Sequence, residues 1–149
     1  MSKKLIDPRG PRFGAVITSV LLLADVYLSL DSKTFSASVA LLAVIVALFA
    51  IGAFLGNSRH PWGLIYKKFV RPLLADPKEL EDARPPQFAQ LVGLIVSATG
   101  LMFGLAGISI GLTIFVAAAF FAAFLNAAFN FCLGCQIWLG LARAGIFKA

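Results

Sequence analysis

The sequence contains long stretches without a charged residue, such as residues 35–55. An α-helix rises about 1.5 Å per residue, so about 20 residues cross the roughly 30 Å hydrocarbon core of a bilayer. Hydrophobic residues make up 60% of the 149-residue chain, and the mean hydropathy is +0.90, whereas soluble domains are roughly 45–50% apolar. A core of this size cannot bury so much apolar surface. Lipid must therefore cover part of the chain.

We predict an all-α integral membrane fold in one domain, residues 1–149, with four transmembrane helices in two antiparallel hairpins. The spans are predicted at residues 13–30, 35–55, 88–107 and 111–131. Only Asp-Ser-Lys-Thr separates the first two spans. A single helix through both would be roughly 65 Å long, so this tetrapeptide must be a turn. Prolines before Phe13 are expected to prevent an earlier helix start.

The loop at residues 56–86 is predicted to contain an amphipathic helix that lies in the membrane interface. Apolar side chains recur there at helical spacing, at Trp62, Ile65, Phe69 and Leu73. The predicted interfacial anchors are Trp62, Lys67, Lys68 and Arg71. Pro61 is expected to start this helix and Pro72 to bend it. A D-P-x-E pattern at residues 76–79 predicts a further helical turn.

The basic residues predict the orientation of the chain. Of the 13 Lys and Arg residues, four precede Phe13, six lie in the loop 56–86 and two in the segment 132–149. By the positive-inside rule these regions are cytoplasmic. We predict a multi-pass protein of the inner cell membrane with both termini in the cytoplasm. The formal charge of +6 suits anionic lipid headgroups, and no nucleic-acid partner is expected.

The two cysteines, Cys132 and Cys135, form the C-x-x-C arrangement of dithiol redox sites. If the chain breaks near Gly134 and a new helix begins at the motif, its N-terminus would lower the thiol pKa and favour the thiolate. The pair could then alternate between dithiol and disulfide or hold a persulfide, with Cys132 as the attacking thiol. Alternatively, the cysteines are small packing residues of a membrane helix.

The segment 132–149 is predicted to be an interfacial or re-entrant helix with Gln136 and Arg143 toward water; one long helix that leaves the bilayer is the alternative. No cofactor or metal is expected, because two thiolates supply half of a tetrahedral zinc site. The single histidine, His60, is expected to be solvated in a separate loop.

Polar residues inside the predicted spans are few. Asp25 should face a polar partner, be protonated, or extend to the interface. Asn126 and Asn130 are expected to hydrogen-bond between helices and, on a continuous helix, to point away from the cysteines. A face of small residues predicts close helix packing; it comprises Gly93, Ser97, Gly100 and Gly104. No Ser-His-Asp set, phosphate loop or paired carboxylates are present, which excludes hydrolase and nucleotide chemistry.

Four segments, taken in order, resemble a bacterial membrane-protein family catalogued as domain of unknown function 4395. They are I-D-P-R-G-P-R-F, G-L-I-Y-K-K-F-V-R-P, P-P-Q-F-A-Q and F-C-L-G-C. The resemblance covers nearly the whole chain and implies a helical membrane domain with a C-L-G-C motif, but no established reaction. Gln87 departs from the family pattern, which has arginine there, so no anion contact is expected at this position.

Our hypothesis is that Cys132 and Cys135 form a membrane-tethered dithiol that exchanges electrons or sulfur with a thioredoxin-like or rhodanese-like protein. The alternative is a structural or assembly role as an accessory subunit of a larger membrane complex. A small-solute channel or transporter is less favoured because the spans contain few polar residues. The lipid bilayer is a predicted partner, and the sequence leaves a homo-oligomer open.

Overall fold

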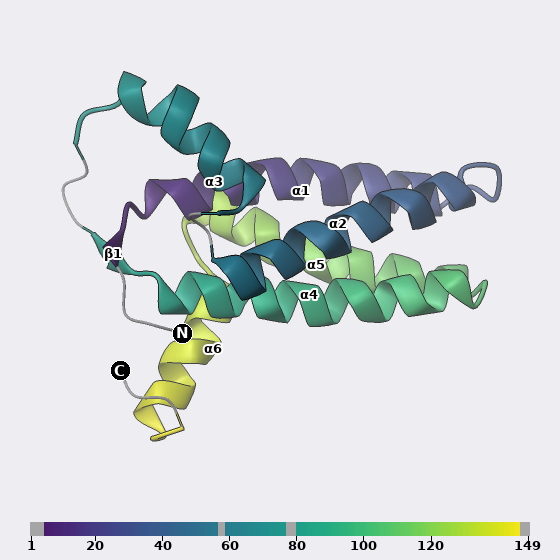
Figure 1. The fold of residues 1–149 in the computed structure, drawn as a ribbon. Helices are drawn as coiled ribbons and strands as arrows, with labels where there is room; N and C mark the ends of the chain where they lie inside the picture. Colours follow the sequence, from purple (N-terminus) through teal and green to yellow (C-terminus); the bar gives the residue numbers. More distant parts are fainter. Residues whose placement is uncertain (1–4, 57–58, 77–79, 147–149) are drawn as a thin grey trace.

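The computed structural model describes residues 5–56, 59–76 and 80–146. Figure 1 shows four long helices side by side: α1 (Arg9–Ser29), α2 (Phe35–Leu55), α4 (Arg84–Leu105) and α5 (Ser109–Phe129). Each contains 21 or 22 residues, a length of about 32 Å. The predicted helical chain, with four helices long and apolar enough to span a membrane, is confirmed.

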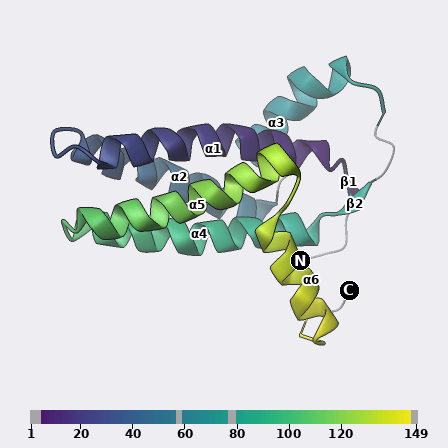
Figure 2. The same cartoon turned by 180° about the vertical axis from the view of Figure 1, so that it is seen from behind.

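The remaining elements lie at one end of the bundle, opposite the short connections 30–34 and 106–108 (Figures 1 and 2). Two short strands, β1 (Leu5–Ile6) and β2 (Glu81–Asp82), pair antiparallel there, which the all-α prediction misses. After α2, α3 (Pro61–Ile65) continues into a π-helical turn (Tyr66–Val70) and a 3₁₀ turn (Arg71–Leu73), and α6 (Leu133–Arg143) follows α5. The predicted turn at 76–79 falls largely outside the described residues.

Both α1 and α4 begin earlier than predicted, at Arg9 instead of Phe13 and at Arg84 instead of Phe88. The prolines do not prevent this, because they lie in the first helical turn, where backbone N–H groups have no intrahelical acceptor. Asp7 accepts the N–H of Arg9 at 3.0 Å, and Asp82 accepts the N–H of Arg84 at 2.9 Å. The same aspartate-based start therefore occurs twice.

The fold consists of two similar halves, β1–α1–α2–α3 and β2–α4–α5–α6. The segment D-P-R-G-P-R-F at 7–13 matches D-A-R-P-P-Q-F at 82–88. Arg12 donates to the Ala127 carbonyl at 3.1 Å, and its equivalent Gln87 donates to the Ala53 carbonyl at 2.9 Å. In the strand pair, Ile6 lies opposite its own equivalent, Glu81. These relations indicate an internal repeat about an approximate twofold axis, as in parallel-repeat membrane proteins.

The packed core lies in the half of the bundle nearer the short connections. It comprises Leu22, Leu42, Ile45, Leu112, Val116 and Ala119. Asp25 is fully buried beside this core, and the Ser38 hydroxyl of α2 bonds its carboxylate. The other carboxylate oxygen of Asp25 has no hydrogen-bond partner among the described residues. Asp25 thus faces the bundle interior and does not extend to the interface.

We expect Ser38→Ala to lower the thermal unfolding midpoint of the detergent-solubilised protein. The substitution removes the side-chain partner of a buried carboxyl group, which costs roughly 1–3 kcal/mol. Ser36→Ala is the matched control, because Ser36 is exposed on the same helix. Equal midpoints for the two variants would contradict a stabilising Ser38–Asp25 contact.

Candidate functional site

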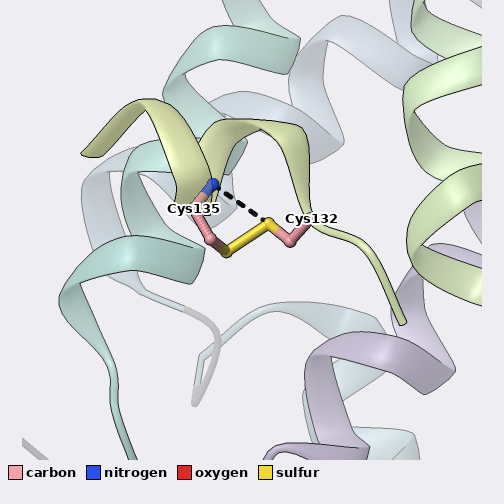
Figure 3. Close-up of a disulfide and its surroundings, with 2 residues drawn as sticks. All are labelled: Cys132 and Cys135. Atoms are coloured by element: carbon pink, nitrogen blue, oxygen red, sulfur yellow. Dashed lines mark hydrogen bonds between the residues drawn. A yellow bond between two sulfur atoms is a disulfide. The ribbon is translucent and has the colours of Figure 1, made fainter. Parts of the chain in front are cut away.

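A disulfide joins Cys132 and Cys135, whose Cα atoms are 5.1 Å apart. Cys132 is the N-cap residue of α6, and its Sγ accepts a hydrogen bond from the Cys135 N–H at 3.1 Å (Figure 3). Both cysteines are half-buried. The sulfur atoms therefore lie at the N-terminus of a helix, where the dipole favours negative charge.

The break before the cysteine pair occurs at Asn130 and not near Gly134 as predicted. Asn130 has φ 55° and ψ 31°, a left-handed conformation that ends α5 at Phe129. Asparagine tolerates this conformation better than most other residues with a side chain. Asn130 is consequently a helix cap and lies just outside the span in which it was predicted.

Gly134 instead lies in the first turn of α6, where it is buried against α4. A Cβ atom added at Gly134 would lie 2.5 Å from the Ala89 Cα. Because that neighbour is backbone, the contact cannot be relieved by a rotamer change. The glycine allows the cysteine-bearing turn to lie directly on α4.

A cleft of about 620 Å³ adjoins the disulfide. The first turn of α6 and the facing sides of α1, α4 and α5 line it, and both cysteines are among the lining residues. Asn126 and Asn130 also line this cleft. The expectation that they point away from the cysteines assumed a continuous helix, and this condition does not hold because α5 ends at Phe129.

The predicted small-residue face of α4 lies against α2 and α5. Ser97, Gly100 and Gly104 are buried, and the Ser97 hydroxyl donates to the Gly93 carbonyl at 2.6 Å. A Cβ atom at Gly93 would collide with the ring of Phe49 on α2, and one at Gly104 would lie 2.5 Å from a Leu112 methyl group on α5. A side chain at Gly93 or Gly104 would therefore require Phe49 or Leu112 to move.

The predicted interfacial anchors have different surroundings. Trp62 is half-buried on the α1 side of α3, near Gly14. Lys67 and Lys68 are exposed, and the Lys68 ammonium lies 5.4 Å from the Phe69 ring centroid. Arg71 forms ion pairs, at 3.5 Å with Asp7 and at 3.0 Å with Asp76.

His60 is buried, which corrects the prediction of a solvated residue. It is the N-cap residue of α3, and its Nδ1 accepts the N–H of Trp62 at 3.1 Å. Burial lowers the pKa of His60, against the opposing effect of a hydrogen bond with the Leu48 backbone. Among the described residues, no group of three His, Cys, Asp or Glu side chains could hold a metal ion.

Two clusters at the starts of α1 and α4 were not predicted from the sequence. Asp7 accepts hydrogen bonds from Arg9 and from the Tyr66 hydroxyl, at 2.9 Å for the latter. Partial burial raises the pKa of Asp7, but the hydrogen bonds from Arg9 and Tyr66 outweigh it and lower the pKa to about 2. The carboxylate is therefore charged at neutral pH and links the π-helical turn after α3 to the start of α1.

The equivalent cluster in the second half links α6 to the start of α4. Arg84 pairs with Asp82 at 2.7 Å, and its guanidinium lies 5.1 Å from the ring centroid of the buried Trp138. The signal for both clusters was the repeated D-x-R pattern. They position the short helix of each half at the same end of the bundle.

We expect Gly134→Ala to displace α6 from α4 and to speed reduction of the disulfide by dithiothreitol severalfold. Gly140→Ala is the matched control in the same helix, because a Cβ atom there would meet nothing within 4 Å. Reduction can be followed by mass after alkylation. If both variants are reduced at the rate of the parent protein, the Gly134–Ala89 contact does not hold the cysteine-bearing turn.

A family model described as "Domain of unknown function (DUF4395)" matches residues 6–143. No curated protein and no solved structure matches the chain. The matched region includes both halves of the repeat and the cysteine pair, and the resemblance noted in the sequence is confirmed. The chain belongs to the DUF4395 family.

Proposed function

We propose that Cys132 and Cys135 form a membrane-embedded thiol–disulfide centre that exchanges electrons or sulfur with a soluble thioredoxin-like or rhodanese-like protein. One observation carries this proposal: the disulfide lies at the N-terminus of α6, at a site where the other half of the repeat has no cysteine. Comparing the equivalent helix starts of the two halves indicates which residues the fold requires at this site and which it does not.

The N-cap of α3 corresponds to the N-cap of α6. His60 caps α3 by accepting a backbone N–H, just as Cys132 does in α6. The residues that follow are Pro-Trp-Gly in the first half and Leu-Gly-Cys in the second. Capping requires one side-chain acceptor, so the architecture explains neither the choice of thiols nor the presence of a second one. This favours chemistry over packing for the pair.

The exchange follows ordinary thiol–disulfide chemistry. In the dithiol form, the Cys132 thiolate attacks a partner disulfide, an S–S bond forms between the proteins, and one partner thiol leaves. Cys135 then attacks the Cys132 sulfur, which restores the intramolecular disulfide and releases the second partner thiol. Two electrons pass to the partner. The same steps in reverse let a partner dithiol reduce the Cys132–Cys135 disulfide, which passes two electrons to the pair. For sulfur transfer, the Cys132 thiolate attacks the outer sulfur of a partner persulfide, the partner S–S bond breaks, the partner thiolate leaves, and Cys132 becomes the persulfide.

In the proposed topology the four long helices cross the inner membrane as two antiparallel hairpins, with both termini and the loop 56–86 in the cytoplasm. The distribution of Lys and Arg supports this orientation. The α3 segment and α6 project sideways from the same end of the bundle (Figure 1). Exposed Leu64, Phe69 and Leu73 accompany Lys67 and Lys68 on the α3 segment, which suits a helix in the interface.

We expect Cys135→Ser to accumulate a mixed disulfide between Cys132 and its soluble partner in cells, visible on non-reducing gels and identified by mass spectrometry. The attacking thiol remains in this variant, whereas the resolving thiol is absent. Cys132→Ser is the matched control and should accumulate much less adduct.

Alkylation of the parent protein should also show both dithiol and disulfide forms as growth conditions change. A redox state that never changes, together with full complementation by the double serine variant, would favour the accessory-subunit alternative. A stoichiometric membrane partner retained by that variant would favour it further.

A topology measurement checks the cytoplasmic placement. We expect green fluorescent protein fused after Ala149 to fluoresce, and alkaline phosphatase at the same site to be inactive, because the enzyme needs export for activity. Fusions after Lys33, in the connection between α1 and α2, should give the opposite pattern. The reverse result would place the disulfide outside the cytoplasm and rule out cytosolic partners.

A further inference from the structure

The cleft beside the disulfide occurs where the two halves of the repeat differ. The helices α2 and α5 have equal lengths, and when they are aligned end to end all three buried positions of α5 coincide with buried positions of α2. Ile45, Leu48 and Phe49 of α2 then correspond to Ala119, Ala122 and Ala123 of α5. Three large side chains in the first half are thus replaced by methyl groups in the second. The first half also has a cleft, of about 870 Å³, but α2 lines it only near its C-terminal end, at residues 53–55, whereas α5 lines the cleft beside the cysteines as deep as Ala118.

The cleft extends from the disulfide into the membrane-spanning part of the bundle. Ala119 lines it and lies ten residues before the end of α5 at Phe129, about 15 Å along the helix axis. That distance is roughly half of the hydrocarbon thickness. An occupant of the inner part must therefore be soluble in lipid.

The lining has a polar end and an apolar end. Groups that can hydrogen-bond lie toward the cysteines, and they include Arg12, Asn126, Asn130 and Gln136. The deeper lining is mostly apolar; it contains Thr18, Phe49, Val96 and the α5 alanines. The volume of about 620 Å³ lies within the roughly 300–1,000 Å³ range of small-molecule sites. The lining suits an amphipathic molecule with a polar ring and an apolar tail.

We propose that the cleft binds an isoprenoid quinone that reoxidises the Cys132–Cys135 dithiol. This inference rests on the proposed function. In the reaction two S–H bonds are lost and one S–S bond forms, while the quinone gains two electrons and two protons and leaves as the quinol. A quinone meets the demands of the site because it dissolves in lipid, accepts two electrons, and carries carbonyl oxygens for the polar groups. A lipid acyl chain would fill the apolar part but accept no electrons.

Binding is tested apart from redox chemistry in the Cys132→Ser/Cys135→Ser protein, with decylubiquinone as the probe and quenching of tryptophan fluorescence as the readout. Trp138 lies on α6, the helix that carries the pair. We expect saturable quenching that Ala123→Phe weakens at least about tenfold, because this change restores the side chain of the first half. Ala122→Leu should weaken it less. The control Ala117→Phe, on the exposed side of α5, should leave binding unchanged.

Turnover is tested anaerobically with the protein that retains both cysteines, reduced beforehand and placed in nanodiscs. One equivalent of decylubiquinone should yield one disulfide and one quinol, and Ala123→Phe should slow this reaction at least about tenfold while disulfide exchange with dithiothreitol keeps its parent rate. Altered exchange with dithiothreitol would mark that variant as misfolded. The rate of quinol formation by Ala122→Leu would then test the proposal.

Three results would overturn the quinone proposal. They are the absence of saturable quenching, a loss of decylubiquinone binding in Ala117→Phe as large as in Ala123→Phe, and binding without quinol formation. If a saturated C10 alcohol competes with decylubiquinone at equal concentration, the cleft is an acyl-chain site and the proposal also fails. In all these cases normal exchange with dithiothreitol would leave the proposed thiol–disulfide function intact. A pair that no thiol can reduce would instead contradict the proposed function itself.

Discussion

The left-handed turn at Asn130 determines where the cysteine pair lies. Because α5 ends at Phe129, the chain crosses the end of the bundle and starts a new helix at Leu133. Cys132 thereby becomes an N-cap residue, and Gly134 allows the first turn of α6 to contact the backbone of α4 at Ala89. With a continuous helix the two thiols would extend away from the bundle. They would have neither the helix N-terminus nor the cleft beside them.

The long helices could be predicted from hydropathy and charge because lipid imposes a length and an apolar composition on each span. Local details were harder to predict. Prolines usually indicate that a helix cannot begin before them, although in the first turn they cost no hydrogen bond. A glycine such as Gly134 predicts a helix break, whereas here its small size allows α6 to pack on α4. The break lies at Asn130, whose amide side chain gives a weaker signal for positive φ than a glycine does.

The internal repeat could have been found in the sequence from the two D-x-R-x-P segments at 7–11 and 82–86. Similarity beyond these segments is slight, because equivalent core positions hold different residues, such as Asp25 and Gly100 or Phe49 and Ala123. The contact of Asp7 with Tyr66 and the stacking of Arg84 on Trp138 join residues far apart in sequence. Such pairs show no helical periodicity, so only the fold brings them together.

The two halves share one backbone arrangement, so the residues that differ between them are the candidates for specific functions. In the first half, the α2 positions equivalent to the α5 alanines hold large side chains that do not line the cleft of that half, and His60 caps α3 without a thiol nearby. In the second half, small α5 side chains and two thiols occur together at one end of one cleft. Packing alone would favour filling that space, since empty volume beside apolar side chains destabilises a bundle. Small α5 side chains and two cysteines thus occur together in the second half only. A ligand that binds beside the disulfide explains this combination better than the requirements of the fold do.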